Sequence, residues 1–238
     1  MEKVIIGNWK MNPASKEEAL ELFAAVKKGI EDVKTTVVIC PPFAYLSLLN
    51  GLTLGAQNVS YEEKGAFVGQ VSPSMLKDLG VEYVILGHSD VRSSLAETDA
   101  MINKKIKESL SIGLAPVLCV GEKEGEDKNQ ILETEVTEAF KNISAEEAEK
   151  VMIAYEPVWA IGTGKNCSVA ETVTSLAIIR NTLSKLYSQD VAEKIKVLYG
   201  GSVTSENAAS YLEQESINGL LVGGASLKPE EFIKIAHS

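Results

Sequence analysis

The sequence contains no apolar run that approaches the roughly 20 residues a helix needs to cross a lipid bilayer. Its first residues pass directly into a predicted strand, so we expect no secretory signal. Cysteine is scarce, and Cys40, Cys119 and Cys167 are odd in number and lack the spacing of a metal site. We therefore expect reduced, buried thiols in a cytoplasmic protein, and no metal site.

Positively charged residues are fewer than negatively charged ones. The chain has 23 lysines and arginines against 33 aspartates and glutamates, which gives a formal net charge of −10. This balance argues against nucleic acid and anionic membranes as partners. A small anionic substrate would instead need a local positive field, for which Lys10 and main-chain amides are the visible candidates.

Two nucleotide-binding motifs are missing. The chain has no G-x-G-x-x-G, and the P-loop pattern fails because Gly164-Lys165 is followed by Asn166 rather than by serine or threonine. Both absences weaken a Rossmann or P-loop interpretation. No compositional break divides the 238 residues, and no low-complexity segment occurs. A single domain over residues 1–238 is therefore expected.

The chain does contain a recurring unit, in which an apolar run and a turn-rich end are followed by a helical pattern. Several runs are continuous rather than alternating, which is typical of strands covered on both faces in a parallel sheet. Ser15 and Ser168, each with a glutamate three residues later, predict the starts of two helices. The runs are residues 4–6, 37–40, 52–54, 83–86, 116–120, 151–155, 195–199 and 220–222. Eight such units predict an α/β fold, a (β/α)8 TIM barrel, with an open doubly wound sheet as the alternative.

Three ionisable residues follow apolar runs at comparable places. Glu156 comes directly after residues 151–155 and precedes a glycine-rich stretch, while Lys10 and His88 follow the first and fourth runs. In a barrel the active site forms at the carboxyl ends of the strands. A carboxylate, an imidazole and an ammonium group there suggest abstraction of a proton next to a carbonyl group. Each residue taken alone is more often a solvated loop side chain.

Paired glycines end the last two runs, at Gly200-Gly201-Ser202 and at Gly223-Gly224. Glycines let backbone N–H groups approach a ligand, and a helix that starts there adds its positive end. Barrel enzymes frequently bind phosphate after their last two strands. We therefore expect a phosphate site at these ends, although a single glycine pair is more often a simple turn.

Seven segments in order form a recognisable pattern. They are Gly7-Asn-Trp-Lys-Met-Asn12, Gly55-Ala-Gln-Asn58, Ile85-Leu-Gly-His-Ser89, Cys119-Val-Gly-Glu122, Ala154-Tyr-Glu-Pro-Val-Trp-Ala-Ile-Gly-Thr-Gly-Lys165, Tyr199-Gly-Gly-Ser-Val203 and Leu221-Val-Gly-Gly-Ala-Ser-Leu227. Together they resemble the triosephosphate isomerase family over essentially the whole chain. The resemblance implies a homodimeric enzyme without a cofactor. It would interconvert dihydroxyacetone phosphate and D-glyceraldehyde 3-phosphate through an enediolate, in glycolysis and gluconeogenesis.

The resemblance also implies a role for each candidate residue. Glu156 would move a proton between two carbons, and His88 would be the neutral electrophile that polarises the carbonyl group. Lys10 would stabilise negative charge on the enediolate and the phosphate. A lid over residues 157–165 would exclude water. The other substrate-binding residues would be Asn8, which positions the substrate, and Gly162, Ser202, Gly223 and Gly224, whose N–H groups would bind phosphate.

One departure from the family pattern lies next to the predicted histidine. Asp90 stands where the family normally has glutamate. Because aspartate is one methylene shorter, we expect it not to reach Lys10 or His88, and we expect slow turnover as a result.

Other departures concern the predicted dimer. Val68 and Gln70 replace a threonine and a glutamate in the loop that enters the neighbouring subunit in the family, and Val91 replaces an arginine that pairs with that glutamate. The linked loss of polar contacts predicts a weakened or altered dimer. Neutral drift at exposed positions is the alternative explanation.

Two other functions compete with the isomerase. One is a non-catalytic barrel that retains phosphosugar binding, and the other is a different phosphate-binding barrel enzyme, such as an aldolase or an indole-synthesis enzyme. The ordered set of segments disfavours the second. The presence of Asn8, Lys10, His88 and Glu156 together favours catalysis over the first.

Overall fold

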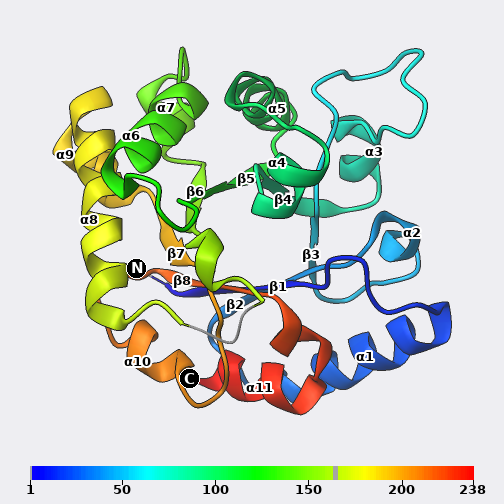
Figure 1. The fold of residues 1–238 in the computed structure, drawn as a ribbon. Helices are drawn as coiled ribbons and strands as arrows, with labels where there is room; N and C mark the ends of the chain where they lie inside the picture. The colour runs from blue at the N-terminus through cyan, green and yellow to red at the C-terminus, as the bar shows by residue number, and fades with distance from the viewer. Residues whose placement is uncertain (1, 163–165) are drawn as a thin grey trace.

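Eight parallel strands close into a barrel (Figure 1). The computed structural model describes residues 2–162 and 166–238. The strands are β1 (Val4–Asn8), β2 (Thr36–Cys40), β3 (Thr53–Ala56), β4 (Val81–Leu86), β5 (Ala115–Val120), β6 (Met152–Tyr155), β7 (Val197–Tyr199) and β8 (Gly219–Val222). β1 pairs with β8 as well as with β2, which closes the sheet. The predicted (β/α)8 barrel is thus confirmed, and the open doubly wound sheet is excluded.

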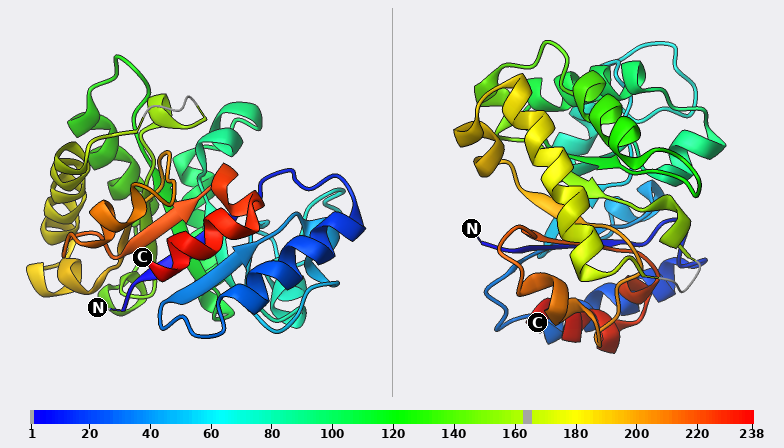
Figure 2. Two further views of the ribbon diagram at one scale, coloured as in Figure 1. Left: turned by 90° about the horizontal axis from the view of Figure 1, so that it is seen from below. Right: turned by 60° about the vertical axis from the view of Figure 1, so that its left-hand side comes forward.

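Helices connect the strands and cover the outside of the barrel (Figures 1 and 2). The longer ones are α1 (Lys16–Gly29), α5 (Asp99–Ser111), α6 (Lys128–Ala139), α8 (Val169–Leu186) and α11 (Pro229–His237). The shorter ones are α2 (Phe43–Leu46), α3 (Pro73–Asp78), α4 (Ser89–Ser94), α7 (Ala145–Ala148), α9 (Gln189–Lys194) and α10 (Ala208–Leu212), with 3-10 turns η1 (Val158–Ala160) and η2 (Gly224–Leu227). Figure 2 shows α1 and α11 side by side, so the first and last helices cover the seam where β1 meets β8.

Two of the predicted helix starts are formed by serine caps. The Ser15 hydroxyl accepts the N–H of Glu18 at 3.2 Å, and the Ser168 hydroxyl accepts the N–H of Glu171 at 3.2 Å. Each bond satisfies a donor that has no partner inside its helix. Pro229 occupies the first turn of α11, where a residue without an N–H group costs nothing.

Apolar side chains fill two regions on either side of the strands. The cluster inside the barrel consists of Val4, Ile6, Val38, Cys40, Ile85, Val117, Cys119, Ala154, Leu198 and Leu221. A larger cluster lies between the strands and the surrounding helices and includes Trp9, which is fully buried. Burial on both faces explains why the apolar runs are continuous. Cys40, Cys119 and Cys167 are buried and unpaired, as expected. Within the described residues, no helix combines the length and the apolar content of a membrane span.

Candidate active site

The carboxyl ends of β1, β4, β6, β7 and β8 border a cavity of about 440 Å3. Asn8 ends β1, His88 and Glu156 follow β4 and β6, and Gly200 and Gly223 follow β7 and β8. Because the strands are parallel, these ends meet at one rim of the barrel. Every residue predicted to act in catalysis or substrate binding lines the cavity: Asn8, Lys10, His88, Glu156, Gly162, Ser202, Gly223 and Gly224.

The imidazole of His88 faces the carboxylate of Glu156. His88 Nε2 lies 3.2 Å from Glu156 Oε1, and both side chains are almost wholly buried. The backbone N–H of Ser89 points to Glu156 Oε2 across 3.4 Å. A proton acceptor and a hydrogen-bond donor are thus close enough to act on one small molecule.

The hydrogen bonds of His88 define its tautomer. Its Nδ1 accepts the backbone N–H of Asp90 at 3.0 Å, and a ring nitrogen that accepts a hydrogen bond does not carry the proton of a neutral imidazole. The proton of neutral His88 therefore sits on Nε2, the atom that faces Glu156. In this orientation a neutral imidazole can donate a hydrogen bond to a substrate oxygen.

Lys10 has a left-handed backbone conformation, with a φ of 52°. Such a conformation is uncommon outside glycine and persists where the surroundings hold it. Here the Lys10 N–H donates to Asn8 Oδ1 at 3.0 Å, and its carbonyl oxygen accepts from Gln57 Nε2 at 2.8 Å. Lys10 Nζ lies 3.0 Å from Asp90 Oδ2. The expectation that Asp90 is too short to reach Lys10 is therefore wrong, because the first turn of α4 brings its carboxylate close enough.

Glycine-containing segments form the other wall of the cavity, where the sequence predicts phosphate binding. Gly223 lies beside Lys10, since a Cβ added to this glycine would be 3.7 Å from Lys10 Cε. The glycine backbone and the Lys10 side chain therefore border the same space, where an acidic chain would need a local positive field to bind an anion. No group of three metal-ligating side chains occurs among residues 2–162 and 166–238.

Comparison with known proteins relates this chain to an enzyme family. The family model described as Triosephosphate isomerase matches residues 3–238. The chain belongs to the triosephosphate isomerase family. Proteins named triosephosphate isomerase from Alkaliphilus oremlandii, Caldanaerobacter subterraneus and Dictyoglomus thermophilum are 45%, 45% and 43% identical to it. The alignments cover 98%, 98% and 99% of this chain and the same shares of the three relatives. The expected family and its isomerase activity are thereby confirmed.

The lid expected in a triosephosphate isomerase is described in part, because residues 163–165 lie outside the described residues. Its first half forms η1, and Ser202 Oγ donates to the Ala160 carbonyl oxygen at 2.8 Å. Trp159 Nε1 donates to Glu122 Oε1 at 2.9 Å, and the same buried carboxylate accepts the Tyr155 hydroxyl at 3.1 Å. The sequence singled out Glu122 only as part of a motif. Its position just after β5 was the available signal for this contact with the expected lid.

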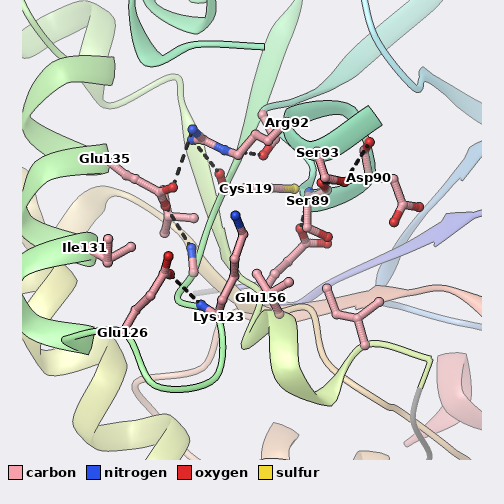
Figure 3. Close-up of a pocket in the computed structure, with 15 residues that line it drawn as sticks. Ser89, Asp90, Arg92, Ser93, Cys119, Lys123, Glu126, Ile131, Glu135 and Glu156 are labelled. Atoms are coloured by element: carbon pink, nitrogen blue, oxygen red, sulfur yellow. Dashed lines mark hydrogen bonds and ion pairs between the residues drawn. The ribbon is translucent and has the colours of Figure 1, made fainter. Parts of the chain in front are cut away.

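A second cavity of about 390 Å3 shares Glu156 with the first (Figure 3). Arg92 on α4 and Glu135 on α6 approach each other on its wall, with Arg92 Nη1 3.4 Å from Glu135 Oε1. The sequence assigned no role to this pair. Burial raises the pKa of Glu135 to about 7. Burial, followed by the nearby charge of Glu156, also raises the pKa of the Cys119 thiol well above its usual range, so this thiol stays neutral at physiological pH.

The third loop, residues 57–72 between β3 and α3, and the neighbouring helix α4 carry the other departures from the triosephosphate isomerase pattern. The side chain of Val68 is fully exposed, and Phe67 beside it is partly exposed. Gln70 and Val91 line the same cavity of about 250 Å3 between this loop and α4. The replaced polar positions therefore lie near one another at one face of the chain.

Proposed function

We propose that the chain interconverts dihydroxyacetone phosphate and D-glyceraldehyde 3-phosphate in glycolysis and gluconeogenesis, with residues 1–238 acting as one catalytic domain. The observation that carries this proposal is the meeting of Glu156, His88 and Lys10 around one cavity. The three come from distant parts of the chain. Each supplies something the reaction needs: a base, a neutral hydrogen-bond donor and a positive charge.

The proposed roles follow from the weak acidity of a C–H group next to a carbonyl. Glu156 removes the proton from one carbon and returns it to the next. The Nε2–H of His88 donates to the carbonyl oxygen, and this bond strengthens as negative charge develops there. The Lys10 ammonium group stabilises the same charge. Interactions that strengthen in the transition state are those that raise the rate.

The remaining residues bind and enclose the substrate in this proposal. Asn8 orients the reactive end, since its side chain already fixes the backbone of Lys10. The phosphate is bound by the N–H groups of Gly162, Ser202 and the pair at residues 223–224. Closure of the lid excludes water, which prevents loss of phosphate from the enediolate.

A coupled assay on D-glyceraldehyde 3-phosphate tests the function, with Glu156→Gln as the decisive variant. Glutamine keeps the size of the side chain but cannot accept the substrate proton. We expect kcat to fall by about 10²- to 10⁴-fold, the usual contribution of a general base. Glu133→Gln is a matched control, because it removes one negative charge from an exposed position on α6. Equal rates for Glu156→Gln and the wild type would exclude Glu156 as the base.

The same assay separates the isomerase from its nearest rival. A barrel that only binds phosphosugars would bind dihydroxyacetone phosphate in calorimetry without converting it. Binding without turnover by the wild-type protein would therefore replace the isomerase with a phosphosugar-binding function. Turnover that depends on Glu156 would exclude the binding protein.

We further propose a cytoplasmic homodimer, weakened at the third loop. Exposed apolar side chains at Met11, Phe67, Val68 and Leu95 support an interface between two copies. The weakening rests on the loss of polar groups near Val68. A reducing compartment is supported by the three buried, unpaired cysteines.

A further inference from the structure

The carboxylate of Glu135 contacts two structural elements behind the active site (Figure 3). Its Oε2 accepts the backbone N–H of Gly121 at 2.9 Å, and its Oε1 lies 3.4 Å from Arg92 Nη1. Glu135 projects from α6 and only 14% of its side chain is exposed. It does not line the proposed substrate cavity, and the mechanism above gives it no role. Burial of a carboxylate costs free energy, so a largely buried carboxylate outside the substrate cavity calls for a structural or functional role.

The contact with Gly121 connects Glu135 to the proposed base, Glu156. The backbone of Gly121 lies directly against that of Glu156, since a Cβ added to Gly121 would be 1.7 Å from the Glu156 carbonyl oxygen. The Glu156 N–H also donates to the carbonyl oxygen of Val120 at 2.8 Å. A displacement of Gly121 therefore displaces the main chain that carries the Glu156 carboxylate.

The contact with Arg92 connects Glu135 to the proposed electrophile, His88. Arg92 Nε donates to the Gly87 carbonyl oxygen at 2.7 Å, and Nη2 donates to that of Cys119 at 3.3 Å. Gly87 directly precedes His88. Asp99 and Glu135 hold the guanidinium group at Nη1, with Asp99 Oδ1 at 2.6 Å. Bonds of this kind fix both the distance and the orientation of the groups they join.

We infer that ionised Glu135 is a positioning residue for the proposed isomerase reaction, and that it fixes the placement of Glu156 through Gly121 and of His88 through Arg92. The inference rests on the proposed function and adds to it a group outside the substrate cavity. Placement matters because a shift of about 1 Å between reacting groups can cost on the order of 100-fold in rate.

The charge of Glu135 changes near neutral pH. Burial is the largest cause of its raised pKa, about 7, while Arg92 and the bond from Gly121 act in the opposite direction. The ionisable groups that face it are Arg92 on α4, Asp99 on α5, Cys119 on β5 and Glu126 on the loop before α6, with Lys123 on the wall of the same cavity. Above pH 7 the ionised carboxylate pairs with Arg92, and the pairing is lost as the pH falls through about 7.

The test compares kcat for the wild type and Glu135→Gln across the pH range. Glutamine imitates the neutral form and keeps an oxygen for the Gly121 N–H. We expect the wild-type to variant ratio to be about 1 below pH ~6 and on the order of tenfold above pH ~8. Titration of the substrate affects both enzymes alike and cancels in the ratio. KM should change little, because the phosphate-binding amides are not touched, and Glu133→Gln should keep a ratio of about 1 throughout.

Amide NMR shifts provide a reading that does not depend on activity. The Gly121 amide reports the ionisation of Glu135, and the Ser89 amide, 3.4 Å from Glu156 Oε2, reports whether the change reaches the active site. We expect both to titrate together near pH 7 in the wild type, and neither to do so in Glu135→Gln. A kcat ratio that stays near 1 at every pH in an active enzyme overturns the inference. So does a Ser89 amide whose shift does not change near pH 7 in the wild type, or one whose shift changes equally in Glu135→Gln. An inactive wild type in which both amides titrate together refutes the proposed function and supports the positioning network.

Discussion

The ammonium group of Lys10 lies 3.0 Å from the carboxylate of Asp90, at the start of α4. Asp90 Oδ2 is also 3.7 Å from His88 Nδ1, the nitrogen that accepts the Asp90 N–H. One aspartate therefore contacts both the cationic and the imidazole groups of the site. Because 57% of the Asp90 side chain is exposed, solvent screens the pair, and its main effect is to orient Lys10 rather than to stabilise the fold.

This contact predicts different outcomes for two substitutions at one position. Asp90→Asn removes the charge that holds the Lys10 ammonium group, so kcat/KM should fall by about two- to fivefold at low ionic strength. Asp90→Glu keeps the charge and should change kcat/KM by less than about twofold, because the aspartate carboxylate already reaches Lys10. The coupled isomerase assay measures both. A large gain in rate on Asp90→Glu would mean that the short side chain limits turnover after all.

A second prediction uses the glycine that packs against the proposed base. A Cβ on Gly200 would lie only 2.8 Å from Glu156 Cγ, so Gly200→Ala must displace the Glu156 side chain. We expect kcat to fall by up to about 100-fold, the cost of a displacement of about 1 Å. KM should change much less, because Gly200→Ala leaves the predicted phosphate-binding amides in place.

Gly80→Ala is the matched control for this substitution. Gly80 has a φ of 75° and no atom within 4 Å of an added Cβ, so alanine there strains only the backbone. The control should lower the free energy of unfolding by about 1–2 kcal/mol without changing kcat. If Gly200→Ala retains the wild-type kcat, the carboxylate tolerates displacement and the packing argument fails.

The sequence predicted which residues gather at the candidate active site better than the contacts that support them. Glu156, His88 and Lys10 were predictable because each follows an apolar run, and parallel strands bring their carboxyl ends together. The contact between Glu135 and Gly121 was not, because it depends on the rotation of α6 against β5. The prediction from side-chain length alone, that Asp90 would not reach Lys10, was also wrong. Its reach depends on the backbone of the first turn of α4, which is fixed by the bond to His88.

A third prediction concerns stability and the raised pKa of Glu135. The unfolded chain ionises this carboxyl near its usual value of 4.5, whereas the folded chain retains the proton up to about pH 7. The neutral, buried form therefore contributes stability fully below pH 4.5, and that contribution is lost as the pH rises through about 7. At about 1.4 kcal/mol for each pH unit between 4.5 and about 7, the loss is about 3 to 4 kcal/mol at most.

Glu135→Gln lacks this ionisation, so it should gain stability relative to the wild type as the pH rises from 5 to 8. Urea unfolding at fixed protein concentration measures the difference at each pH. Glu133→Gln should show no such trend, because Glu133 is exposed and pairs with Lys185 at the surface. A difference between wild type and Glu135→Gln that does not vary with pH would show that Glu135 ionises at the same pH in the folded and unfolded chain.

The fourth prediction tests the proposed dimer through Val68, whose side chain is fully exposed in the single chain. Val68→Asp should leave the folded chain unchanged in circular dichroism, because a charge at an exposed position costs less than about 0.5 kcal/mol. If the loop is buried against a second copy, the same charge loses its water and the dimer dissociates at least about tenfold more readily. Sedimentation velocity at micromolar concentration should show a shift from dimer to monomer.

Val68→Thr distinguishes a weakened interface from neutral drift. Threonine matches valine in shape, has a hydroxyl group in place of one methyl group, and restores the residue of the family pattern at this position of the loop. If the loop is buried against a second copy, that hydroxyl group can gain a polar partner there, so the dimer should tighten, and kcat/KM should rise if the dimer is the active form. Drift at an exposed position predicts no change in either. A wild-type protein that sediments as a tight dimer at every concentration, and that Val68→Thr does not alter, would contradict the weakened interface.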